Sequence, residues 1–223
     1  MVMDQPMLAI TRRTLIGRLG ALGLGVPLAV PLAIPLAFTA RPALATSDGA
    51  RAFIQTIGER AMKVAAGARE RRKDGLKELI ADGLDIEAVG RFALGAFLRQ
   101  SNPKKVEEYL GVFHGYVMMA YPDMLAKFDL RAFNILSVKA SEGDTTFIAT
   151  TIEYGEKDKS EVGWYVREVK PGAYKIQDVQ LEGFSLRAFQ RAKFEKILRD
   201  KWIDGLIRIL AGWVKAGKEE PYF

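Results

Sequence analysis

The sequence predicts an α+β domain in which an antiparallel four-stranded sheet is packed on one face by N- and C-terminal helices. Residues 49–127 carry apolar side chains at the spacing of helix faces, and residues 131–181 alternate between apolar and polar as strands do. Residues 184–215 return to the helical period. This order, with helices first, strands next and helices last, is typical of α+β domains.

Capping and turn residues mark the first predicted helices. Asp48 is a suitable N-cap for a helix over residues 49–66. Residues 69–85 follow as a charged connection and a second short helix, which Gly75 and Gly83 should break. The charged run RERRK at its start is typical of a solvated helix face.

The next helices begin after Asp85 and at Pro103. Asp85 caps a short helix, and Pro103 suits the first turn of a long amphipathic helix that ends near residue 127. Pro122 should kink or end that helix, because proline lacks the backbone N–H that a helix interior needs. Two further helices are predicted at residues 184–200 and 202–215.

The four strand segments are joined by short links that carry turn residues, namely SEGD, GEKDKS and KPGA. Links this short join neighbouring antiparallel strands, whereas parallel strands need a long crossover. The strands are predicted at residues 131–140, 145–154, 161–169 and 173–181.

The first 45 residues have the composition of a secretory signal peptide, which leaves residues 46–223 as a single mature domain. Basic residues come first, an apolar stretch follows from Leu19 to Phe38, and Ala43-Leu44-Ala45 offers a cleavage site. The alternative is a retained membrane anchor, against which Pro27, Pro31 and Pro35 argue. The pair Arg12-Arg13 resembles a twin-arginine signal, so export by Sec or Tat and a periplasmic location are expected.

Charge and cysteine content exclude several classes of protein. The formal net charge is +6, but the first 45 residues contain four arginines and one aspartate, so the mature domain carries only +3. That charge does not indicate a nucleic-acid-binding protein. The chain has no cysteine, which excludes disulfides and thiolate metal sites.

Catalytic chemistry is hard to find in this sequence. The single histidine, His114, lies inside the long predicted helix, and no phosphate loop, dinucleotide fingerprint or metal-ligand spacing is present. Asp178 is the one suggestive acid, because it lies four residues from Tyr174 on a predicted strand and a buried Asp with a Tyr donor can catalyse isomerisation. The alternative favoured here is structural: Asp178 accepts hydrogen bonds from Ser185, Arg187 and backbone N–H groups after the turn at Gly183.

An ordered set of short motifs resembles the MlaC family. The clearest lies in residues 162–198, VGWYVREVKPGAYKIQDVQLEGFSLRAFQRAKFEKIL. Its matching positions are Trp164, Tyr174-Lys175-Ile176, Asp178-Val179, Glu182-Gly183, Ser185, Arg191 and Phe194, with Tyr174 where the family more often has Trp. The segments RFALG, residues 91–95, and DGLIRIL, residues 204–210, also resemble the family. The resemblance covers about residues 50–215.

The resemblance implies a periplasmic phospholipid carrier without catalytic residues, cofactor or metal. Family members are also described as toluene-tolerance auxiliary proteins. In the family, the carrier moves lipid between an outer-membrane lipoprotein–porin complex and an inner-membrane ABC transporter with an MCE-domain subunit. Related proteins are encoded with hopanoid genes, so a hopanoid or another apolar lipid is an alternative ligand.

A lipid carrier needs an internal apolar cavity for the acyl chains, because each CH₂ removed from water contributes ~0.8 kcal/mol. Strand alternation places one set of candidate lining residues on the sheet, and the helices across from it supply the other. For every one of them, ordinary core packing is the alternative. The predicted lipid-binding residues are Phe92, Phe97, Phe113, Val117, Tyr121, Ile148, Ile152, Val162, Trp164, Val166, Tyr174, Ile176 and Phe184.

Overall fold

The computed structural model describes residues 43–140, 144–156 and 158–219. The predicted signal peptide lies outside the described residues, except for its last three positions, which begin the first helix. The described residues form one compact unit. The buried clusters contain no residue before Ala50, so a chain that starts at Thr46 contains the whole described core.

Six helices lie in the described residues, and most begin where the sequence predicts. Asp85 caps α3 by accepting the backbone N–H of Ala88, and Asn102 caps α5 in the same way through Lys104. Gly75 does not break α2, which is continuous over its 15 residues. The helices are α1 (Ala43–Ala66), α2 (Arg69–Gly83), α3 (Ile86–Leu94), α4 (Phe97–Gln100), α5 (Pro103–Leu125) and α6 (Leu186–Ala216).

The sheet has five antiparallel strands in sequence order, not the four that were predicted. Glu182 and Gly183 both adopt positive φ, 49° and 82°, and this pair makes the tight turn of a hairpin. Phe184 and Ser185 therefore pair with β4 before α6 begins. The strands are β1 (Leu130–Ala140), β2 (Thr145–Tyr154), β3 (Asp158–Lys170), β4 (Ala173–Leu181) and β5 (Phe184–Ser185).

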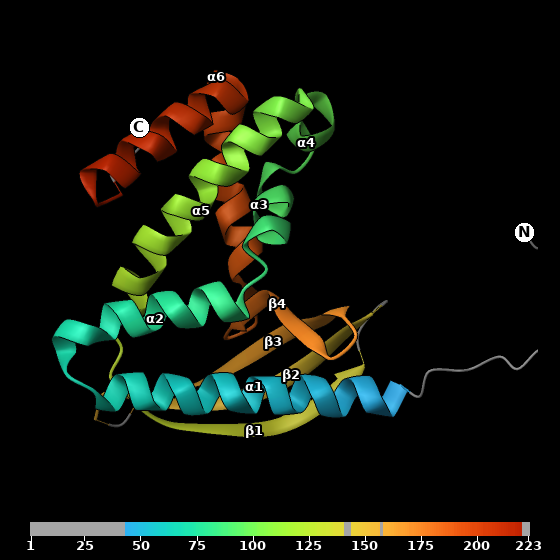
Figure 1. The fold of residues 1–223 in the computed structure, drawn as a ribbon, viewed down its shortest axis with the longest axis vertical. Helices are drawn as coiled ribbons and strands as arrows, with labels where there is room; N and C mark the ends of the chain where they lie inside the picture. Colours follow the sequence, from blue (N-terminus) through green and yellow to red (C-terminus); the bar gives the residue numbers. More distant parts are fainter. Residues whose placement is uncertain (1–42, 141–143, 157, 220–223) are drawn as a thin grey trace, which may run out of the picture. The chain divides into compact units, whose positions relative to one another are not determined.

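Helix α6 turns a corner at Trp202, where the sequence predicts a break between two helices. Trp202 has φ 55° and ψ −172°, a conformation that is costly for any residue other than glycine. The Trp202 ring packs edge-on against Phe97 of α4 at 5.5 Å between centroids. The two halves of α6 therefore run in different directions, as Figure 1 shows.

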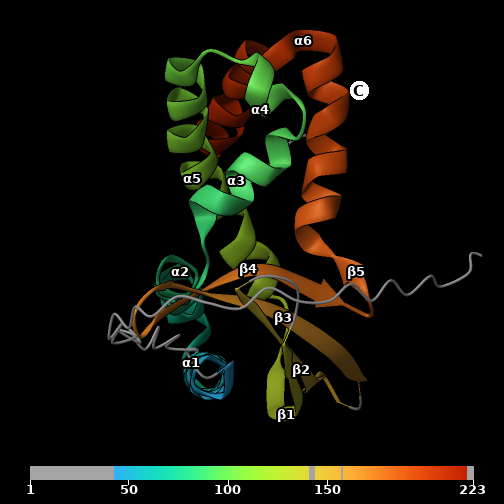
Figure 2. The same cartoon turned by 90° about the vertical axis from the view of Figure 1, so that its right-hand side faces the viewer.

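Two groups of helices lie against the sheet in different ways. Helix α1 runs along one face of the sheet, and α2 returns above α1 (Figure 1). Helices α3 to α6 stand as a second group on the β4 side of the sheet, which Figure 2 shows from the side. None of the helices within the described ranges combines the length and the apolar character needed to cross a bilayer.

The buried apolar side chains form two clusters rather than one. The helical cluster contains residues of α2, α3, α5 and α6. The sheet cluster contains Ala50 and Ile54 of α1 with Ile148, Val166 and Ile176 of the strands. Leu84 is the only described residue that packs against both clusters. A domain usually has one contiguous core, so the division is a distinctive feature of this fold.

Helices α3 and α5 approach closely at Gly90. The phenol of Tyr109 donates to the Gly90 carbonyl oxygen at 3.2 Å. A methyl group added at Gly90 would lie 2.7 Å from a ring carbon of Phe113 and 2.9 Å from a methyl carbon of Leu110. Glycine is therefore required here for packing, although a helix interior generally disfavours it.

We expect Gly90→Ala to lower the free energy of unfolding by about 2 kcal/mol, because the fully buried Phe113 has no room to move. Gly111→Ala is the matched control, since a methyl group on that α5 glycine meets no atom within 4 Å. The control should raise stability by up to about 1 kcal/mol. Urea unfolding of both variants measures the difference, and equal effects would contradict the close approach at Gly90.

Candidate functional site

The predicted strand residues lie on one face of the sheet. The pairs Ile148 with Trp164 and Val166 with Ile176 stand opposite each other in the register, and directly opposed residues share a face. Ile152, Val162 and Tyr174 follow by alternation. The register confirms the alternation read from the sequence for all seven residues. Helix α1 packs on this face, where five of the seven belong to the sheet cluster and Ile152 and Val162 do not.

The predicted helix residues lie elsewhere. Phe113 and Val117 are fully buried in the helical cluster, and Phe97 and Tyr121 pack against it. Phe92 lies beneath the guanidinium group of Arg187, 4.4 Å from the ring centroid. Most of these residues therefore belong to the helical cluster, apart from the predicted strand residues in the sheet cluster.

Phe184, which was predicted to line the internal apolar cavity, does not lie in the interior. The hairpin of β4 and β5 places Phe184 opposite Leu181 at the end of the sheet. No helix or strand of the described chain covers it there, and 78% of Phe184 is exposed. The apolar character of Phe184 had suggested the buried side of a helix, whereas the residue belongs to a two-residue strand.

A β-bulge separates the directions of Tyr174 and Asp178. Tyr165 pairs with Asp178 and Val166 pairs with Ile176, so β4 has one extra residue at this point, Gln177. Because Tyr165 and Val166 point to opposite faces, Asp178 points away from the face that holds Ile176 and Tyr174. Tyr174 and Asp178 therefore lie on opposite faces of β4, whereas the isomerase-like interpretation requires them on the same face.

The Asp178 carboxylate joins the sheet to the start of α6. Asp178 is 4% exposed, and it accepts the Ser185 hydroxyl at 2.6 Å and the backbone N–H groups of Val179 and Arg187 at 2.9 and 3.1 Å. The Arg187 guanidinium lies 3.5 Å away. These partners satisfy the buried charge, as the structural interpretation of the sequence predicts. Ser185 also caps α6 by accepting the backbone N–H of Ala188.

We expect Asp178→Ala to lower the free energy of unfolding by about 3 kcal/mol, because Arg187 and two backbone N–H groups lose their buried acceptor. Ser185→Ala is the control, and it should cost only about 1 kcal/mol through the lost cap. Guanidinium unfolding followed by circular dichroism distinguishes them. Ordinary surface substitutions change the free energy of unfolding by roughly 0.5 kcal/mol or less. A change no larger than that for Asp178→Ala would rule out the structural role.

A group of tyrosines lies between α5 and α6. The phenol of Tyr116 donates to Glu219 at 3.0 Å, and its ring lies edge-on to Tyr121 at 6.4 Å. Burial raises the pKa of Tyr121 to about 12, with smaller contributions from the charges of Glu219 and Asp178. Burial likewise raises the pKa of Tyr109 and of Tyr116 well above the usual range.

The raised pKa of Tyr121 predicts a loss of stability at high pH. Below pH ~10 the phenol is protonated in both folded and unfolded chains. Between pH ~10 and about 12 only the unfolded chain releases this proton, so the free energy of unfolding falls as pH rises. Tyr121→Phe should make that fall shallower by up to ~1.4 kcal/mol per pH unit. Urea unfolding at a series of pH values tests this, and identical slopes would contradict it.

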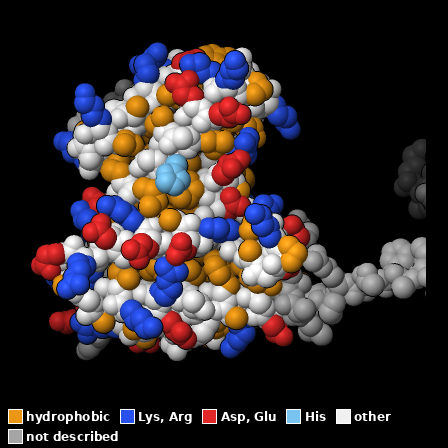
Figure 3. Space-filling model, viewed as in Figure 1, with side chains coloured by type: hydrophobic (Ala, Val, Ile, Leu, Met, Phe, Trp, Pro, Cys, Tyr) orange, Lys and Arg blue, Asp and Glu red, His pale blue; other side chains and the backbone are white. Residues whose placement is uncertain are grey.

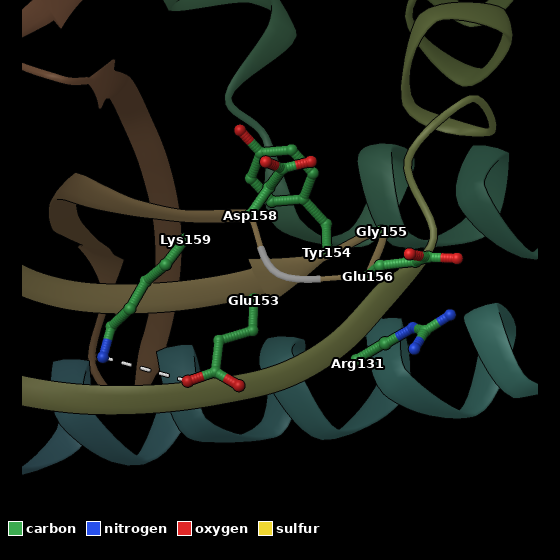
Figure 4. Close-up of a pocket in the computed structure, with 7 residues that line it drawn as sticks. All are labelled: Arg131, Glu153, Tyr154, Gly155, Glu156, Asp158 and Lys159. Carbon is green, nitrogen blue, oxygen red and sulfur yellow. Dashed lines mark ion pairs between the residues drawn. The ribbon is translucent and has the colours of Figure 1, made fainter.

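A pocket of about 300 Å³ opens at the turn between β2 and β3. Figure 4 shows that charged side chains line it, with an ion pair of 3.8 Å between Lys159 and Glu153. An acyl chain here would bury charges without partners, and none of the predicted lipid-binding residues lines this pocket. No three His, Asp or Glu side chains of the described chain converge as metal ligands. The lining residues are Arg131, Glu153, Tyr154, Gly155, Glu156, Asp158 and Lys159.

Sequence reasoning missed the residues that complete the apolar face of the sheet. Phe133, Val138 and Val179 pack on the sheet cluster, and α1 contributes Ala50 and Ile54. The alternation of β1 and the apolar spacing of the first helix carried this signal. Leu84, the residue between the two clusters, gave no signal, because its importance comes from contacts between distant segments.

Two comparisons with known proteins agree with this architecture. The family described as MlaC protein matches residues 50–212, which is most of the chain. The solved structure of a phospholipid-binding protein from Ralstonia solanacearum, in complex with a phospholipid, superposes with a TM-score of 0.59 at 16% sequence identity. The match covers 75% of this chain and 98% of that one, and at this identity it shows a shared fold.

Proposed function

Because the chain belongs to the MlaC protein family, we propose that it is a lipid carrier that takes the acyl chains of a phospholipid into its apolar interior. The phospholipid bound by the Ralstonia protein of similar fold supports this ligand class. In this proposal the protein binds and releases lipid and catalyses no reaction. The structural partners of Asp178 support that view, because the one suggestive acid is used to join two elements.

The divided core is the observation that carries the proposal. The helical cluster and the sheet cluster share only Leu84 among the described residues. An acyl chain that enters between them separates few existing contacts, whereas entry into one dense core would disrupt many. Hydrophobic side chains also reach the surface along α5 down to α2, near this boundary, as Figure 3 shows.

Each cluster also has partly buried apolar side chains that suit an apolar ligand. On the sheet side, Trp164 and Val179 pack on the sheet cluster but are only partly buried. On the helix side, Met118, Met119 and Tyr121 pack on the helical cluster and are also partly buried. Methionine adapts to irregular shapes, which favours a site that accepts different acyl chains. The transfer of each CH₂ from water to this interior contributes ~0.8 kcal/mol.

The carrier would act in the periplasm after export by Sec or Tat. The basic and apolar composition of residues 1–45 supports export. Its proposed partners are an outer-membrane lipoprotein–porin complex and an inner-membrane ABC transporter with an MCE-domain subunit. A hopanoid is the alternative cargo, and it would keep the apolar site while changing the pathway.

Native mass spectrometry of residues 46–223, purified without detergent and followed by lipid extraction, tests the proposal. One phospholipid per protein is the expected result. A bound hopanoid would support the carrier and identify the other cargo. A folded protein that carries no lipid, and takes up none from added phospholipid, would overturn the proposed function.

Neighbouring positions on β4 offer a matched pair of variants. Val179 packs on the apolar face, whereas Gln180 donates to the phenol of Tyr165. We expect Val179→Glu to reduce bound lipid at least about tenfold, since a carboxylate on the path of an acyl chain must be buried without a partner. Gln180→Glu adds the same charge one residue away and should keep its lipid. Equal lipid content in the two folded variants would contradict the proposed site.

A further inference from the structure

Two phenylalanines protrude from the turn that joins the sheet to α6. Phe184 is 78% exposed and Phe189 is 71% exposed, the largest values among the large apolar side chains of the described chain. Leu181 and Leu186 beside them in the chain are also exposed. These four residues, Leu181, Phe184, Leu186 and Phe189, are named the apolar tip. Leu181 and Phe184 stand opposite each other at the end of β4 and β5, on the face that also carries Val162, whereas Leu186 and Phe189 belong to the first turn of α6. Figure 2 shows this junction of β4, β5 and α6.

The backbone beneath the apolar tip is held firmly. Glu182 donates its backbone N–H to the Glu161 carbonyl, and its carboxylate accepts the Glu161 N–H, both at 3.1 Å. On the other side of the turn, Ser185 and Arg187 bond to the buried Asp178. The two phenylalanines are therefore presented to solvent by a fixed scaffold. Exposed apolar side chains of this size mark a site of interaction.

The first half of α6, which follows the apolar tip in the chain, carries an excess of positive charge. Residues 186–201 contain six basic and two acidic side chains. Arg187, Lys193 and Arg199 have carboxylate partners within the described chain. Arg191 and Lys196 form no ion pair with any described residue, and both are exposed. The charge indicates an anionic partner.

We propose that the apolar tip and the basic side chains of α6 bind directly to the surface of an anionic lipid bilayer. Phenylalanines this exposed do not pack against their neighbours, whereas protein interfaces centre on well-packed anchors. A fluid bilayer accepts single protruding apolar side chains at the boundary between headgroups and acyl chains. In this arrangement Lys196, seven residues after Phe189 and therefore on the same side of α6, meets the anionic headgroups. Arg191, whose guanidinium lies over the Phe92 ring, adds to the attraction from a greater distance.

Bilayer binding is distinct from lipid carriage and is measured separately. The experiment is co-sedimentation of residues 46–223 with vesicles of phosphatidylcholine alone, or of phosphatidylcholine mixed with phosphatidylglycerol. We expect binding to the mixed vesicles that weakens as salt is added, because the charges are exposed. The paired change Phe184→Ser with Phe189→Ser should reduce the partition coefficient at least about tenfold.

Leu136→Ser is the matched control, because Leu136 is 54% exposed on β1 at the opposite edge of the sheet. It should bind vesicles as the unchanged protein does. Changing Arg191 and Lys196 to Gln should remove the preference for phosphatidylglycerol and leave the lipid content by mass spectrometry as it was. If the unchanged protein binds anionic vesicles but holds no lipid by mass spectrometry, that result counts against the carrier function alone.

Three results would overturn the proposal. The unchanged protein could fail to bind either kind of vesicle, it could bind neutral and anionic vesicles equally, or the Phe184 and Phe189 variant could bind as well as the Leu136 control. If the unchanged protein binds no vesicles but the two phenylalanines are needed to bind a purified membrane-protein complex, the apolar tip is a protein-docking surface. Circular dichroism of each variant confirms that it is folded.

Discussion

The buried carboxylate of Asp178 is the interaction on which the arrangement of the two helix groups depends. It accepts hydrogen bonds from the end of β4 and from the first residues of α6, so it fixes where the helical group leaves the sheet. A buried charge is stable only when its partners are held in place. The bulge at Gln177 is what turns Asp178 toward α6, and without it the carboxylate would face the apolar side of the sheet.

The hydrogen bonds of Asp178 hold the sheet and the start of α6 together, although the core is divided into two clusters. Helix α6 is attached to β4 at one point, while α1 belongs to the sheet cluster and α5 to the helical cluster. The two clusters are thus parts of one chain with few mutual contacts. A protein that must admit and release a bulky apolar ligand needs such a boundary, because dense packing transmits every change in volume to its neighbours.

Much of the fold could be predicted from the sequence because turns and caps are local. The links between strands, the caps at Asp85 and Asn102 and the corner near Trp202 all depend on residues within a few positions of one another. The bulge at Gln177 left a sign in the sequence that was not used: Gln177 and Asp178 are two polar residues in a row, so the apolar positions shift from Tyr174 and Ile176 to Val179 and Leu181.

The same limit applies to the candidate site. Alternation grouped Ile148, Trp164 and Ile176 on one face correctly, because a strand fixes the direction of each side chain. It could not show that Phe113 and Val117 face a different cluster, since that depends on how helices pack at a distance. Phe184 was misjudged because a two-residue strand is too short to produce a period.

The corner at Trp202 divides α6 into halves with different attachments. The first half is anchored to β4 through Arg187. The second half ends at Ala216, and the carboxylate of Glu219 just after it meets Tyr116 and Lys193. A pulling force applied at the C-terminus therefore acts first on the Glu219 contacts and on the second half of α6. Because Lys193 belongs to the first half of α6, its ion pair with Glu219 ties the end of the described chain back across the corner at Trp202.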